Sequence, residues 1–133
     1  MHMFKLYGIS LVLFLALDAV WLGVIAKSLY QKELVHLLGP VRFSSAAVFY
    51  LIYLFGMIYF CLSPAIEAHS ATKALIDGAL FGFVCYATYD LTNFATIKGW
   101  PLKIVIYDLS WGIFITGFTS FATYFVGKWW KVF

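Results

Sequence analysis

The stretch Tyr86-Ala-Thr-Tyr-Asp-Leu-Thr-Asn-Phe-Ala-Thr96 places polar side chains inside an apolar run that is long enough to cross a membrane. It contains Asp90, Asn93 and several hydroxyl groups. Polar and ionisable groups at membrane depth are costly, so they usually face a partner or a cavity and mark a functional site. We therefore take this stretch as the centre of the protein and ask which other segments carry matching groups.

The composition argues against a water-soluble fold. The chain has 133 residues, of which 64% are hydrophobic and 11% are charged, whereas a soluble domain carries roughly 25% charged residues. The formal charge of +3 lies mostly at the ends of apolar runs, as expected of membrane-flanking Lys and Arg. We expect the lipid bilayer, and no nucleic acid, as a partner. The two cysteines, Cys61 and Cys85, have no CxxC spacing and are interpreted as buried apolar side chains.

Four apolar runs predict an all-α integral membrane four-helix bundle that forms one domain over residues 1-133. The predicted spans are 4-26, 43-63, 73-97 and 102-127. The first run is longer than the apolar region of a signal peptide, so we interpret it as a span. Gly99 and Pro101 suit a tight hairpin, which predicts that the last two spans are antiparallel neighbours. Both termini then lie on one side, and the nearly equal basic charge of the two sides leaves the orientation open.

The connection between the first two spans, residues 26–41, is predicted to form a short amphipathic segment at the membrane interface. Its apolar residues recur at helical spacing, with charged residues on the other face: Tyr30, Leu34, Leu37 and Leu38. Gly39 and Pro40 are expected to end this segment. Ser63 and Pro64 are expected to break the second span.

Carboxyl groups on three different spans are predicted to meet in the membrane half next to this segment. Asp18 and Asp90 lie roughly 12–13 Å below the lysines that follow them, at 1.5 Å of helix rise per residue. The pattern Asp-x-x-Trp occurs twice, on helices that run in opposite directions. Tyr86, Asp90 and Asn93 share one helix face. The candidate residues for binding a ligand or carrying protons are Asp18, Trp21, Tyr86, Asp90, Asn93, Asp108 and Trp111.

An alternative is that these groups only form hydrogen bonds between helices. Every Lys and Arg lies at the end of a span or outside it, so none is placed to neutralise three carboxylates. Some of them must then be protonated, share a proton, or face a cation, water or a ligand. This argument favours a functional site. Tyr50 and Tyr53 are further aromatic residues that can line it.

Four short stretches are distinctive: DAVWLG at residues 18–23, YDLTNFAT at 89–96, GWP at 99–101 and DLSWG at 108–112. In these stretches, and over essentially the whole chain, the sequence resembles a family of small bacterial membrane proteins, domain of unknown function 2177. The resemblance implies four transmembrane helices and a location in the bacterial cytoplasmic membrane. The family brings no established activity, substrate or catalytic residue.

Three functions remain open. The first is binding or transport of a small cationic or amphipathic ligand or of protons, in a possible homodimer that is similar in architecture to small multidrug transporters. The second is a membrane enzyme acting on a lipid or isoprenoid substrate, with Asp90 and Asp108 as acid and base and Asn93 orienting. The third is an accessory subunit of another membrane protein. We expect no cofactor and no metal, because no histidine lies within a span and no ligand spacing is present. Carboxylates that face inward favour a site, and outward ones favour a partner interface.

Overall fold

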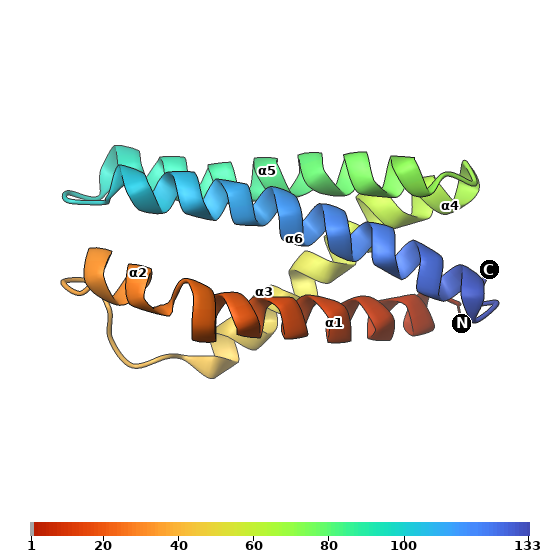
Figure 1. Ribbon diagram of the computed structural model, residues 1–133, viewed down its shortest axis with the longest axis horizontal. Coiled ribbons are helices and arrows are strands. Elements are labelled where there is room, and N and C mark those ends of the chain that lie inside the picture. Colours follow the sequence, from red (N-terminus) through yellow and green to blue (C-terminus); the bar gives the residue numbers. More distant parts are fainter. Residues whose placement is uncertain (1) are drawn as a thin grey trace.

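The computed structural model describes residues 2–133 and is built from helices alone over that range (Figure 1). The elements are α1 (His2–Val20), η1 (Trp21–Ile25), α2 (Lys27–Glu33), α3 (Phe43–Met57), η2 (Ile58–Leu62), α4 (Ser63–Glu67), α5 (Ala71–Thr96) and α6 (Leu102–Trp129). The elements η1 and η2 are single π-helical turns that continue α1 and α3. The helical segments long and apolar enough to cross a membrane are His2–Ile25, Phe43–Glu67, Ala71–Thr96 and Leu102–Trp129. The all-α prediction with four spanning helices is confirmed.

The helices form a bundle with both chain ends at the same side. Figure 1 shows α5 and α6 as a long antiparallel pair, with α1 along the other side of α6 and α3 crossing obliquely toward α5. The α4–α5 connection lies at the end that holds the termini, and α2 lies at the opposite end with the loop between α5 and α6. The predicted antiparallel pairing of the last two spans is therefore confirmed. The end of the bundle that holds the α5–α6 loop therefore also holds α2 and the carboxyl-terminal part of the first span.

Glycines allow the close approach of α5 and α6. A Cβ atom on Gly82 would overlap the Gly112 carbonyl oxygen, and one on Gly78 would lie 2.8 Å from the Thr116 carbonyl oxygen. Helices approach this closely where small residues remove the side chains between their backbones. The GxxxG of α5 thus fixes the register of the pair. That register sets which residues of α5 face Asp108 on α6.

The connecting segment after the first span is shorter as a helix than the sequence predicts. Helix α2 ends at Glu33, and the Leu37 and Leu38 amides both bond back to the Leu34 carbonyl, at 2.8 and 3.0 Å. This turn points Leu34 inward and leaves Leu37 and Leu38 about half exposed, at 47% and 53%. The prediction that the helical face continues to Gly39 and Pro40 is wrong, because the backbone leaves helical geometry at Leu34, where φ is −115° and ψ is 15°.

The second span also differs from expectation, because it continues past Ser63 and Pro64 to Glu67. Pro64 occupies the first turn of α4, directly after the π-helical turn η2. Within a span, a local π-helical adjustment satisfies backbone groups that a proline frees, and here the Ser63 amide bonds back to the Ile58 carbonyl directly before Pro64. The expected break at this proline is therefore wrong.

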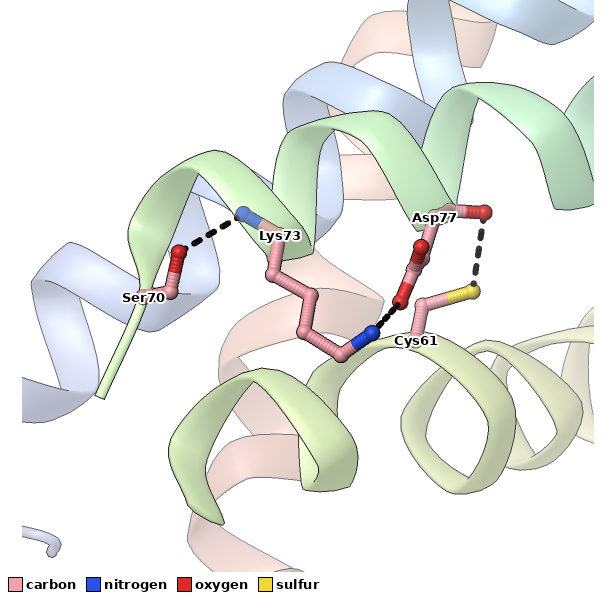
Figure 2. A network of polar contacts seen from close by, with 4 residues as sticks. All are labelled: Cys61, Ser70, Lys73 and Asp77. Atoms are coloured by element: carbon pink, nitrogen blue, oxygen red, sulfur yellow. Dashed lines mark hydrogen bonds and ion pairs between the residues drawn. The ribbon is translucent and has the colours of Figure 1, made fainter. Parts of the chain in front are cut away.

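Polar groups at the start of α5 satisfy one another locally (Figure 2). Ser70 Oγ accepts a 3.1 Å hydrogen bond from the Lys73 amide and caps the helix. Lys73 Nζ pairs with Asp77 at 2.9 Å, and the Cys61 thiol donates to the Asp77 carbonyl at 3.3 Å. Asp77 lies in the second turn because α5 begins at Ala71, earlier than expected. This carboxylate has a cation beside it, unlike the deeper carboxyl groups of the bundle.

Candidate functional site

The two Asp-x-x-Trp motifs meet face to face between α1 and α6. The Trp21 and Trp111 rings stack with their centroids 4.6 Å apart and their planes 5° apart. Trp111 Nε1 donates a 3.1 Å hydrogen bond to Asp18 Oδ1. The π-helical turn η1 begins at Trp21, and such turns occur frequently at functional sites. The repeated motif therefore forms one joint structure.

A tyrosine from α2 and one from α3 complete this network. Trp21 Nε1 donates a 3.0 Å hydrogen bond to the Tyr30 hydroxyl, which in turn donates to Asp108. The Tyr50 hydroxyl donates to Asp18. Each indole therefore serves the carboxyl group of the other motif, Trp111 directly and Trp21 through Tyr30.

Tyr30 lies outside the spans and remains a hydrogen-bond donor over the ordinary pH range. Burial raises the pKa of its hydroxyl above the usual value, and the negative charge of the Asp108 carboxyl raises it further. Helix α2 thus closes the site as a lid whose polar contact with the bundle is a neutral phenol. The contact of Tyr30 with Asp108 agrees with the prediction that the carboxyl groups lie in the half of the membrane next to this segment.

A cavity of about 480 Å³ lies against the network. It is lined by Asp18, Trp21, Leu22, Tyr30, Leu34, Leu38, Phe49, Tyr50, Tyr53, Cys85, Tyr86, Tyr89, Asp108 and Trp111. Aromatic rings make up most of this lining, and its only charged or acidic residues are two aspartates. Asp18 and Asp108 are 7% and 6% exposed. The lining contains no basic residue.

The structure brings five of the seven candidate residues to this cavity and leaves two outside it. The five are Asp18, Trp21, Tyr86, Asp108 and Trp111. Asn93 is partly exposed and is not part of the lining. Asp90 is 0% exposed and also lies outside the lining. Of Tyr86, Asp90 and Asn93, which share one face of α5, only Tyr86 lines the cavity. The functional roles of all seven candidate residues stay predictions.

Asp90 lacks the hydrogen-bond donors that the other two buried carboxyl groups, Asp18 and Asp108, receive. Neither of its carboxyl oxygens has a hydrogen-bond partner within residues 2–133, nor does the indole nitrogen of Trp100. The side chains of Asp108 and Trp100 adjoin it without completing a hydrogen bond. No group of three His, Cys, Asp or Glu side chains in the described part of the chain is arranged to hold a metal ion.

Sequence reasoning missed Tyr30 and Trp100 as parts of the site region. The signal for Tyr30 was its position on the apolar face of the amphipathic segment, one helix turn from Leu34. Trp100 lies between Gly99 and Pro101 of the predicted hairpin, and it is buried against Leu34 and Ile104. Tyr50 and Tyr53 line the cavity, as their aromatic run suggested.

Comparison with known proteins gives one match. The family described as "Predicted membrane protein (DUF2177)" matches residues 3–125, which is nearly the whole chain. No curated protein and no solved structure matches.

Proposed function

Since the chain belongs to the DUF2177 family of predicted membrane proteins, whose description names no ligand or reaction, we propose a function from the cavity itself. The protein binds a small amphipathic cation between Asp18 and Asp108, in the half of the membrane next to α2. One observation carries this proposal: two buried carboxyl groups line a cavity that has no basic residue.

The charge of the cavity supports a cation as the ligand. Asp18 accepts hydrogen bonds from Tyr50 and Trp111, and Asp108 accepts one from Tyr30. All three donors are neutral, so they orient the carboxyl groups without neutralising them. Uncompensated charge inside a bilayer is costly, and a bound cation removes that cost.

The remaining lining supports a ligand with an apolar part. The stacked Trp21 and Trp111 rings present aromatic faces, which attract cations with a strength that grows as water is excluded. Leu22, Leu38 and Phe49 line the cavity and remain partly exposed at its edge. Its volume of about 480 Å³ falls within the range of roughly 300–1,000 Å³ found for small-molecule pockets.

The other two functions have less support. An acid–base pair of Asp90 and Asp108 would need both groups at the substrate, and Asp90 does not line the cavity. An accessory subunit would present its polar groups outward, whereas Asp18, Asp90 and Asp108 are all buried within the bundle.

Equilibrium dialysis against tetraphenylphosphonium tests the proposal directly. The protein is held in a mild non-ionic detergent, and neutral triphenylphosphine oxide is the comparison ligand. We expect saturable binding of the cation only, and a loss of about 30-fold or more in Asp108→Asn, since removing one partner of a buried charge pair costs on the order of 2–5 kcal/mol. The matched control is Asp77→Asn, at the far end of α5 beside Lys73. Equal binding of both ligands, or unchanged binding by Asp108→Asn, would contradict the proposal.

A further inference from the structure

Asp90 is a buried acid that the cation site does not use. Its side chain is 0% exposed, and its two carboxyl oxygens receive no hydrogen bond from any described residue. An ionised carboxylate without a donor is the most costly state that a buried side chain can have inside a membrane. The neutral acid, which carries its own proton, is the form that this environment accepts.

The groups around Asp90 come from three elements, and none of them is basic. They are the Asp108 carboxyl on α6, the Trp100 indole in the loop after α5, and, farther away, the Tyr30 hydroxyl on α2. Asp108 is the only other carboxyl group among them. Two adjoining carboxyl groups without a cation cannot both ionise, so such a pair retains one proton.

The hydrogen bonds indicate which member of the pair holds that proton. Asp108 accepts a hydrogen bond from Tyr30, which suits the carboxylate form. The Asp90 carboxyl receives no hydrogen bond, so we assign the retained proton to Asp90. Asp108 also lines the cavity, whereas Asp90 does not. Asp108 therefore adjoins both Asp90, which carries the proton, and the cavity that takes the ligand.

We propose that Asp90 stores a proton that leaves when a cation binds beside Asp108, so that the protein exchanges one cation for one proton. The cation supplies the positive charge that allows both carboxyl groups to ionise. The proton passes from Asp90 to an Asp108 oxygen and from there to the solvent through the cavity, and Asp90 becomes a carboxylate. The net charge of the site is unchanged. This inference rests on the proposed cation binding.

Proton release on binding is the test. Wild-type protein in weakly buffered detergent solution is mixed with tetraphenylphosphonium, a pH-indicator dye reports the released protons, and dialysis reports the bound cation. We expect close to one proton per bound cation near neutral pH, and an affinity that rises by up to about tenfold per pH unit. Asp90→Asn should bind the cation, release no proton and lose the pH dependence. Asp77→Asn should behave as wild type.

The outcomes separate the two proposals. If the wild type binds the cation without releasing protons, or if Asp90→Asn releases as many as wild type, the proton store is wrong while cation binding stands. If the wild type does not bind the cation, the proposed function fails. In that case the infrared band of a protonated carboxyl group, compared between wild type and Asp90→Asn without ligand, still tests the stored proton. The absence of this band from the wild type would overturn that assignment. This result comes from the wild-type spectrum alone, so it does not depend on whether Asp90→Asn folds.

Discussion

Two cavities among the described residues lie at opposite ends of the first span, and they differ in charge more than in size. The α2-side cavity, described above, has about 480 Å³ and contains Asp18 and Asp108. The terminal cavity has about 740 Å³, and its one charged residue is Lys5. It is lined by Phe4, Lys5, Gly8, Ile9, Val12, Leu13, Val126, Trp130 and Val132. The larger cavity has no network of oriented polar groups.

This difference shows that volume and apolar lining do not by themselves identify a binding site. Specific pockets combine an apolar wall with a few convergent polar groups that fix the ligand. In the α2-side cavity, four hydrogen bonds join two indoles, two phenols and two carboxyl groups. In the terminal cavity, the wall apart from Lys5 and Gly8 consists of aliphatic and aromatic side chains, which suit lipid chains equally well.

The largest expected effect comes from removing both carboxylates of the α2-side cavity. In the double variant Asp18→Asn/Asp108→Asn, tetraphenylphosphonium binding should become undetectable, because no negative charge remains in the lining. Each single variant should bind more weakly than wild type and more tightly than the double variant. Dialysis of the four proteins measures this series. Retained binding in the double variant would mean that the ligand binds to another part of the molecule.

A matched pair of glycine substitutions on α6 compares the packing at the two ends. Gly112→Ala should destabilise the protein by about 1–3 kcal/mol, because its Cβ would overlap the base of the Tyr86 ring in the α2-side cavity wall. Gly127→Ala should cost less, since its Cβ meets the flexible ends of Leu6 and Phe133 at 2.7 and 2.9 Å. Thermal unfolding in detergent compares them, with Gly8→Ala as a control that has nothing within 4 Å. Equal losses at both positions would contradict this packing account.

Tyr30→Phe should remove the link between Trp21 and Asp108 and cost roughly 1–3 kcal/mol. It should also change the response to alkali. The buried Tyr30 hydroxyl has a raised pKa, so above pH about 10 the unfolded state binds fewer protons than the folded state, and stability falls as pH rises. Unfolding curves at neutral and strongly alkaline pH should therefore show a smaller alkaline loss in the variant than in wild type. An identical loss would mean that Tyr30 ionises as freely in the folded protein as in the unfolded one.

The smallest expected effect is that of a substitution in the terminal cavity. Lys5→Gln should leave both cation binding and stability nearly unchanged, within about 0.5 kcal/mol, because Lys5 is exposed and has no ion-pair partner among the described residues. Dialysis and thermal unfolding measure the two properties. A clear gain in cation binding would mean that the lysine repels the ligand from a site at this end.

The four helices and the meeting of the two Asp-x-x-Trp motifs could be predicted from the sequence because both depend on spacing. Span lengths gave the four helices, and the repeated Asp-x-x-Trp placed a carboxyl group and an indole on one face of two antiparallel helices. Helix rise placed these faces in the same half of the bundle. The meeting of Asp18 with Trp111 therefore follows from regular geometry.

Other features depend on contacts that spacing does not determine. Tyr86 and Asp90 lie about 40° apart around α5 at 100° per residue, and that rotation brings Tyr86 to the cavity while Asp90 is fully buried outside its lining. Tyr30 reaches Asp108 because α2 ends early at Glu33 and packs through Leu34. Such outcomes depend on the packing of several helices at once.

Photolabelling would locate the ligand most directly. The protein is irradiated with a quaternary ammonium probe that carries a diazirine, and the labelled peptides are identified by mass spectrometry. We expect labels on residues 18–34 and 108–111, both suppressed by excess tetraphenylphosphonium and absent in Asp18→Asn/Asp108→Asn. Labels concentrated on residues 4–13 and 126–132, and unaffected by the double substitution, would place the cation in the terminal cavity and contradict the account.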